Sequence, residues 1–316
     1  MGIKDIETAI FFDDDKRYAD LLNGYIFGGK QVITEKQLYN QDTREMGKLR
    51  KNSLVEKKRK NIQRFRDGVK RIAFGTSFTI IALEHQDKIH RGMPVRVMVE
   101  DALSYDRQMK KIQKQNQENG VLNKKDYISS LTDTDVLTPV VTIVIYYGEE
   151  PWDNGKDIYD ILDHKDLPEE IKIFINHYPI HVLDVRRFTK EECFKTDVRE
   201  VFGFIRRSSD KEAVKQYLKE RAKQFKNIDE DAYDLIAAMT DTKQLQMVKD
   251  KYRSEEGGIN MCKGLLDWVE ESKSAGEMTI LKLITAMKLD GRTSDITRLS
   301  SEPEFLEGMK KHYHIQ

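Results

Sequence analysis

The sequence predicts an α/β protein in which a mixed sheet is flanked by helices and followed by a helical C-terminal region. Three observations carry this prediction. Residues 140–147 form an apolar, β-branched run that is typical of a buried central strand. Residues 79–83 form a second apolar run, which ends in Glu84. Beyond about residue 196 the pattern becomes almost wholly helical, and no internal repeat occurs at a fixed period.

The first half of the chain predicts helix, strand hairpin and helix in that order. Apolar residues at helical spacing predict a first helix over residues 16–27, ended by the glycines that follow. Residues 40–60 are polar and basic, and they predict a loop with some helix. Strands are expected over residues 66–74 and in the segment that carries Glu84, and a helix over residues 92–115.

The second half predicts two strands and then a series of helices. Residues 116–134 are polar, have no clear period and predict an excursion on the surface. A strand over residues 140–147 is followed by a short one over residues 179–186. The glycine pairs and single glycines serve as breaks between the C-terminal helices, which are expected over residues 197–207, 210–225, 230–239, 242–253, 259–273 and 277–289.

Composition limits the class of protein. The chain has 316 residues, of which 34% are charged, and it has no formal net charge. No segment approaches the roughly 18 apolar residues that span a bilayer, and the N-terminal residues lack the pattern of a signal peptide. Two distant cysteines, Cys193 and Cys262, support neither a disulfide framework nor a zinc site. We therefore expect a cytoplasmic protein without a membrane partner.

The distribution of charge is more informative than its sum. From Arg44 to Arg71 there are twelve Lys and Arg residues against three acids. Such a cluster can neutralise phosphates and make nucleic-acid binding depend on salt. A solvated loop or helix face is the alternative interpretation.

The candidate site consists of two carboxylates that lie seventeen residues apart. Glu84 and Gln86 follow an apolar strand and lie on one of its faces, because strand side chains alternate. Ionised carboxylates are rarely buried without a partner. The simplest partner is a hard divalent cation, Mg²⁺ or else Mn²⁺ or Ca²⁺, held by Asp67 and Glu84 with water. Asp20 is a candidate third carboxylate, although an exposed helix acid is an equal alternative.

Structural alternatives exist for these residues. Asp67 is equally suited to cap a turn, and Glu84 to pair with an arginine such as Arg66. Strand alternation directs His85 away from Glu84, which favours a packed or surface histidine over a general base.

Five side chains are candidate contacts to DNA phosphates: Arg66, Lys70, Arg96, Tyr105 and Gln108. Tyr105 and Gln108 share a helix face at spacing i,i+3. Tyr105 is also suited to the core, and Arg96 to an ion pair with Glu100 or Asp101.

The chain resembles the Rpn family of recombination-promoting nucleases, also called YhgA-like transposases, within the PD-(D/E)XK nuclease superfamily. The likeness covers roughly residues 10–210. It is carried by RYADLLNGYIF at 17–27, GKQVI at 29–33, Arg66-Asp67, EHQ at 84–86, MPVRVMVEDALSYDRQ at 93–108, LTPVVTIVIYYG at 137–148 and Trp152.

This resemblance implies a restriction-endonuclease-like core over residues 1–208, with residues 209–316 as a helical region for assembly or DNA contact. It implies that Asp67 and Glu84 bind the metal and that Gln86 completes the catalytic set. Gln86 stands where the superfamily usually has lysine. Glutamine can orient a water or bind a phosphate oxygen, but it cannot offset charge in the transition state.

Two functions follow as expectations. The first is a magnesium-dependent DNA endonuclease linked to recombination or mobile DNA. The second is a DNA-binding or assembly protein that retains the fold without the chemistry, and an RNA substrate ranks below both because no RNA-binding signature occurs. Residues 279–299 resemble helix, turn, helix, which suits DNA binding or packing between copies in a homo-oligomer.

Overall fold

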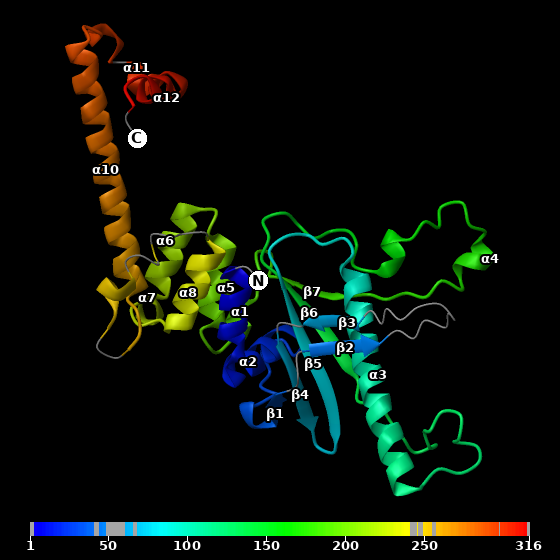
Figure 1. Cartoon of the computed structure of the whole chain (residues 1–316). Coiled ribbons are helices and arrows are strands. Elements are labelled where there is room, and N and C mark those ends of the chain that lie inside the picture. Colours follow the sequence, from blue (N-terminus) through cyan, green and yellow to red (C-terminus); the bar gives the residue numbers. More distant parts are fainter. Residues whose placement is uncertain are drawn as a thin grey trace.

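The protein is described by a computed structural model that covers residues 3–40, 44–48, 61–65, 68–240, 245, 249–254, 257–296 and 298–314. Within these residues the architecture is mixed α/β, with a five-stranded sheet flanked by helices and a helical C-terminal region (Figure 1). The predicted fold class is confirmed.

The central sheet has the strand order β1-β4-β5-β6-β7. Its strands are β1 (Leu38–Asn40), β4 (Gly68–Phe74), β5 (Ser77–Gln86), β6 (Val140–Tyr146) and β7 (His181–Asp184). β4 is antiparallel to both β1 and β5, whereas β5, β6 and β7 are parallel. The sheet is therefore mixed, and the strongest apolar run of the sequence forms β6 next to β5.

Helices cover both faces of this sheet (Figure 1). On one face lie α1 (Ile3–Asp13) and α2 (Asp15–Tyr25), which share a hydrophobic cluster with α5 (Val198–Arg207) and α8 (Glu230–Met239). On the other face lies α3 (Met93–Asn119), which forms the crossover connection between the parallel strands β5 and β6. The predicted helices over residues 16–27 and 92–115 correspond to α2 and α3.

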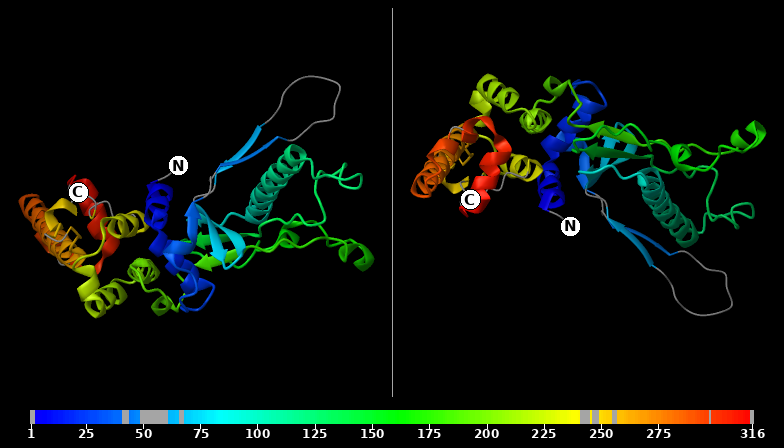
Figure 2. Two further views of the ribbon diagram at one scale, coloured as in Figure 1. Left: turned by 90° about the horizontal axis from the view of Figure 1, so that it is seen from below. Right: turned by 90° about the horizontal axis from the view of Figure 1, so that it is seen from above.

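A separate two-stranded ribbon corrects one prediction. β2 (Arg44–Lys48) pairs with β3 (Asn61–Phe65) in an antiparallel hairpin, where the sequence predicted a loop with some helix. Figure 2 shows that the ribbon projects from the main sheet. The most basic part of the segment, residues 57–60, lies outside the described residues.

The remaining short elements connect these layers. They are the 3₁₀ helices η1 (Glu35–Gln37), η2 (Ile158–Ile161) and η3 (Glu191–Cys193), with the one-turn helix α4 (Glu169–Lys172). The predicted surface excursion after α3 is confirmed over residues 120–134, because Tyr127 and Ile128 there are 82% and 98% exposed.

The C-terminal region is helical, as predicted. Its elements are α6 (Lys211–Glu220), α7 (Ala222–Phe225), α8, η4 (Lys249–Tyr252), α10 (Met261–Leu289), η5 (Thr293–Asp295), α11 (Arg298–Ser301) and α12 (Pro303–His312). The two helices predicted over residues 259–273 and 277–289 form the single helix α10. No helix in the described residues is both long and apolar enough to cross a bilayer.

The core crosses the predicted domain boundary at residue 208. Phe202 and Ile205 before it belong to the same buried cluster as Tyr217 and Tyr233 after it. A second small cluster joins the end of α10 to α11 and α12, around Leu283 (Figure 1). The boundary between residues 208 and 209 remains a prediction.

Replacing Gly24 with alanine is expected to destabilise the protein by about 1–3 kcal/mol, because a close-packed core does not accept an added methyl group. Gly24 is buried in α2, and a Cβ there would lie 2.2 Å from the ring of Phe194. Urea unfolding measures the effect. Gly308→Ala is the matched control, since its added Cβ meets nothing within 4 Å and α12 gains helix propensity. Equal effects at both positions would contradict the packing argument.

Candidate active site

The two faces of β5 have different chemistry. Ile81 and Leu83 face the cluster formed with α1 and α2. His85 lies on the same face, stacked on Phe12 with ring centroids 5.4 Å apart. Glu84 points to the opposite face, beneath α3, and its side chain is completely buried. Strand alternation thus places one carboxylate inside the layer between sheet and helix.

Glu84 forms an ion pair with Arg96 of α3. The distance from Arg96 Nη2 to Glu84 Oε2 is 2.7 Å, and that from Arg96 Nε to Glu100 Oε1 is 3.1 Å. Both glutamates are 0% exposed, whereas the Arg96 side chain is 28% exposed. One guanidinium therefore neutralises two buried carboxylates, and the prediction that Arg96 pairs with Glu100 is confirmed.

The start of α3 determines how these side chains are presented. α3 begins after Gly92 with Pro94 in its first turn, where a missing N–H has no cost. Arg96 and Glu100 are four residues apart and therefore share one helix face. Glu100 belongs to the stripe that α3 buries against the sheet. The register pairs Glu84 of β5 with Val144 of β6.

Polar contacts hold the remainder of α3 on the sheet. Asp101 Oδ1 accepts a hydrogen bond from Thr142 Oγ1 at 2.7 Å, and Oδ2 accepts one from the Tyr178 hydroxyl at 2.5 Å. These bonds connect α3 to β6 and to the segment that enters β7. They satisfy a buried carboxylate that would otherwise destabilise the fold.

Tyr105 and Gln108 also fix the start of β6. The Tyr105 hydroxyl accepts a hydrogen bond from Val140 N at 3.0 Å. Gln108 Oε1 accepts one from Thr138 N at 2.7 Å, and Gln108 Nε2 donates to the Thr138 carbonyl at 3.1 Å. The structure thus assigns both side chains to backbone of their own chain, where the sequence suggested DNA contacts.

The structure places the other predicted site residues unequally. Gln86 is half-buried at the end of β5, and its carbonyl accepts a hydrogen bond from Tyr147 N at 2.9 Å. Arg66 and Asp67 lie outside the described residues. Gly68, which follows Asp67 in the sequence, pairs with Leu83, which precedes Glu84.

Asp20 does not join Glu84. It lies in α2, on the opposite face of the sheet, and is 3% exposed. Its carboxylate accepts hydrogen bonds from Lys195 N at 2.9 and 2.8 Å, from Thr196 N at 2.7 Å and from Thr196 Oγ1 at 2.7 Å. The structure corrects both earlier interpretations, because Asp20 is neither an exposed helix acid nor part of the Glu84 cluster. It fixes the loop that enters α5.

Lys70 is likewise directed away from Glu84. Its Nζ lies 2.8 Å from the Asp13 carbonyl and 2.5 Å from Asp15 Oδ1, and its side chain is 4% exposed. It also lies over the ring of Tyr18, at 5.1 Å from the centroid. These contacts connect β4 to α1 and α2, so the structure does not present Lys70 as a phosphate contact.

His85 is a packed histidine, as strand alternation predicted. Besides Phe12, it contacts Tyr147, whose hydroxyl is 3.3 Å from Nδ1. Burial lowers the pKa of His85 to about 3, so the ring is neutral near pH 7. A ring with such weak basicity on the far face of β5 does not serve the Glu84 cluster as a base.

The stability of the protein is expected to fall below about pH 6.5 because of His85. An unfolded histidine has a pKa of about 6.5, so its neutral form is favoured by folding. Since the folded pKa is about 3, this contribution is complete above pH 6.5 and is lost as pH falls toward 3. Between pH 7 and pH 5 the loss is about 2 kcal/mol. Urea unfolding at both values measures it.

In that experiment His85→Phe is expected to show a loss smaller by about the same amount, because the titrating ring is absent. His312→Phe, which removes an exposed histidine, is the control and retains the dependence of the unmodified protein. An unchanged pH dependence in His85→Phe would contradict the assignment.

The donor set fits a hard cation but is incomplete within the described residues. Among them, no three His, Cys, Asp or Glu side chains form a metal-binding group. Glu84 supplies an oxygen ligand of the kind that Mg²⁺ takes together with water. A second carboxylate from Asp67, beyond the described part, would complete the pair that the sequence predicts.

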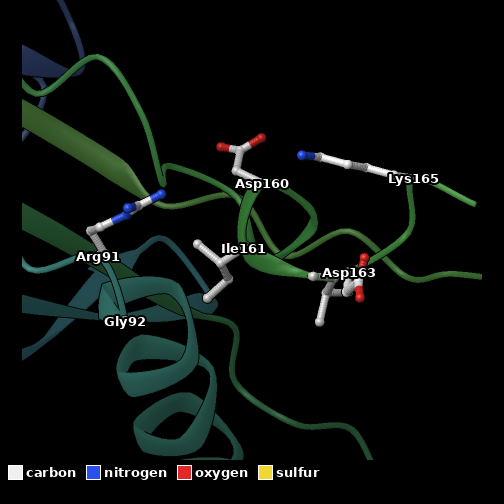
Figure 3. Close-up of a pocket in the computed structure, with 7 residues that line it drawn as sticks. Arg91, Gly92, Asp160, Ile161, Asp163 and Lys165 are labelled. Carbon is white, nitrogen blue, oxygen red and sulfur yellow. The ribbon is translucent and has the colours of Figure 1, made fainter.

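A cavity of about 430 Å³ lies beside the start of α3 but does not include Glu84. Its lining combines Arg91 and Lys165 with Asp160 and Asp163, and Figure 3 shows the Lys165 side chain extended toward Asp160. Asp160 Oδ2 accepts hydrogen bonds from backbone N–H groups at 156 and 157. Mixed charge and structural use of this acid give the cavity no clear ligand.

Sequence reasoning missed the role of Glu100. The available signal was an acid within the apolar stripe of a helix, four residues after Arg96. An acid at a core-facing position predicts either a buried ion pair or a functional group.

Comparison with known proteins gives one family. A family model described as "Putative transposase, YhgA-like" matches residues 45–235, more than half of the chain. The matched range contains Glu84, Gln86 and α3, and the description connects these residues with mobile DNA. Searches among curated proteins and among solved structures gave no match.

Proposed function

The chain belongs to the YhgA-like transposase family, and from this premise we propose that it is a metal-dependent DNA endonuclease that hydrolyses phosphodiester bonds. The resemblance to recombination-promoting nucleases supports the same reaction and connects it with recombination. The proposed substrate is DNA, and the proposed ions are Mg²⁺, Mn²⁺ or Ca²⁺.

The observation that carries the proposal is the burial of Glu84. A carboxylate with 0% exposure at the end of a core strand is costly unless a cation faces it. A purely structural position would be filled at lower cost by the apolar residue that the rest of β5 uses. Retaining an acid there favours a functional site, as perturbed ionisable groups in clefts generally do.

The register of β4 and β5 supports a second carboxylate. Gly68 pairs with Leu83, and Asp67 and Glu84 are the next residues on each side. The proposal continues this antiparallel register by one residue, which sets Asp67 opposite Glu84. Directly opposite side chains share one face of a sheet and lie close together.

The proposed roles follow from the chemistry of each side chain. Asp67 and Glu84 would hold the metal, which supplies an activated water and neutralises charge on phosphate oxygens. Gln86 shares the face of Glu84, and its amide is suited to orient the attacking water or to bind a phosphate oxygen. Because Gln86 carries no charge, a cationic group must come from another element.

DNA contact is proposed for the basic segment between Arg44 and Arg71, within which β2 and β3 form the projecting ribbon (Figure 2). A two-stranded ribbon fits the major groove of B-DNA. Its lysines and arginines would neutralise phosphates, so binding is expected to weaken as salt rises. Fluorescence anisotropy with labelled duplex DNA at two salt concentrations measures this.

The experiment that tests the proposed reaction uses the full chain and supercoiled plasmid. Nicking or linearisation is expected with Mg²⁺ or Mn²⁺ and is expected to vanish with EDTA. Asp67→Ala and Glu84→Ala are expected to lose the activity. Cleavage that persists in both variants would assign the activity to another site or to a contaminant.

A second function is favoured by one specific observation. Arg96 occupies one oxygen of Glu84, and Gln86 lacks the charge of a lysine. Both features suit a DNA-binding protein that retains the fold and lacks the reaction. Salt-sensitive DNA binding without cleavage in any of the three metals would support this alternative.

A further inference from the structure

Arg96 occupies the position in which a cation is needed next to Glu84. We propose that Arg96 is a built-in counter-ion of this site, and that a divalent metal displaces it from Glu84 on binding. The inference rests on the proposed metal role of Glu84. It adds a step that the sequence did not predict, because metal binding becomes an exchange of one cation for another.

Burial and charge carry the first step of the argument. Glu84 and Glu100 are both 0% exposed, and Arg96 lies 2.7 Å from one and 3.1 Å from the other. Two buried carboxylates that face one guanidinium retain an excess of negative charge in a region of low dielectric constant. Such a site attracts a cation with more charge than arginine carries.

The geometry makes the exchange possible without disrupting the fold. Glu84 is fixed by a central strand that is paired on both sides. Arg96 is partly exposed on α3, and its pair with Glu100 is a local i,i+4 contact. When it leaves Glu84, Arg96 can therefore stay paired with Glu100. Displacement breaks one of the two ion pairs, and the divalent cation replaces it.

The released guanidinium then has a second use. Gln86, on the same face as Glu84, is uncharged, whereas arginine binds phosphate oxygens with two parallel N–H donors. A bound phosphodiester at the metal would bring such oxygens toward the end of α3. Arg96 is thereby the described side chain best placed to supply positive charge when DNA occupies the site.

Isothermal titration calorimetry of the full chain with MnCl₂ tests the exchange. Arg96→Met removes the competing cation and retains an unbranched side chain of similar length. We expect Mn²⁺ to bind at least about tenfold more tightly to this variant than to the unmodified protein, which corresponds to about 1.4 kcal/mol. Arg96→Lys, which can pair with only one carboxylate at a time, is expected to show a smaller change of the same sign.

Arg107→Met is the matched control, because Arg107 is an exposed arginine on the same helix, and its Mn²⁺ affinity is expected to stay unchanged. Circular dichroism checks that each variant is folded. If Arg96→Met does not fold, Arg96→Lys alone still decides the sign. Equal or weaker Mn²⁺ binding in the folded Arg96 variants, or no binding in any variant, overturns the proposal.

DNA cleavage by the same proteins separates this inference from the proposed reaction. Tighter Mn²⁺ binding in Arg96→Met together with no cleavage by the unmodified protein supports the exchange and contradicts the nuclease. Cleavage by the unmodified protein with unchanged Mn²⁺ affinity in Arg96→Met supports the nuclease and contradicts the exchange.

Discussion

Replacing Glu84 with glutamine is expected to lower the rate of metal-dependent plasmid cleavage by on the order of 10²–10³-fold. The amide has nearly the same shape as the carboxylate but no charge, so it holds a divalent cation poorly. A gel assay of supercoiled plasmid at fixed Mg²⁺ concentration measures the rate. The effect is large because Glu84 is the fully buried carboxylate of the site and has no solvent to replace its role.

Two comparisons show whether the loss comes from chemistry. Glu118→Gln removes an exposed acid from α3 and is expected to cleave at the rate of the unmodified protein. Urea unfolding of Glu84→Gln is expected to show a folded protein, because Arg96 retains Glu100 as a partner. A Glu84→Gln protein that is folded and fully active would remove Glu84 from the reaction.

Replacing Arg17 with methionine is expected to destabilise the protein by about 3 kcal/mol or more, because it leaves a largely buried carboxylate without its partner. The Arg17 side chain is 7% exposed, and its Nε and Nη2 each lie 2.9 Å from an oxygen of Asp197. Arg17 also contacts Asp229 at 2.9 Å and Asp231 at 3.2 Å. It thereby connects α2 with the start of α5 and the start of α8.

The free energy of unfolding in urea measures this effect. Arg17→Lys is expected to recover only part of the stability, since a lysine retains the charge but not the two-pronged geometry. Arg253→Met is the matched control: Arg253 is 41% exposed and pairs with the equally exposed Glu230, so its loss is expected to cost less than about 1 kcal/mol. Similar losses at both arginines would contradict a special role for burial.

The sheet was predictable because its strands follow simple patterns. β6 is apolar on both faces and lies between two parallel neighbours, as its composition indicates. β5 could be predicted with its polar end, because Glu84 and Gln86 interrupt an apolar run at period two. The same alternation correctly directed His85 to the other face.

Two elements were missed for physical reasons. α1 has only Thr8, Phe11 and Phe12 among its buried residues, while apolar residues such as Ile3 and Ile6 are exposed. Its apolar stripe was therefore unclear. The hairpin of β2 and β3 is short and rich in charge, and its pairing is not visible in local periodicity.

The candidate site was predictable in its strand residues but not in its cross-chain contacts. Glu84 could be identified because an acid ends a core strand. The roles of Asp20 and Lys70 could not, because each depends on a backbone group or acid from another element, Thr196 and Asp15 among them. Sequence spacing gives the face of a helix or strand, whereas the partner on that face is decided by tertiary packing.

A crystal structure of the full chain grown with Mn²⁺, with the ion located by its anomalous scattering, is the most direct test of the central claim. The account predicts one Mn²⁺ bound at roughly 2.0–2.6 Å to carboxylate oxygens of both Asp67 and Glu84, with the Arg96 guanidinium moved away from Glu84. An ion bound elsewhere, or Asp67 and Glu84 on opposite faces of the sheet, would contradict it.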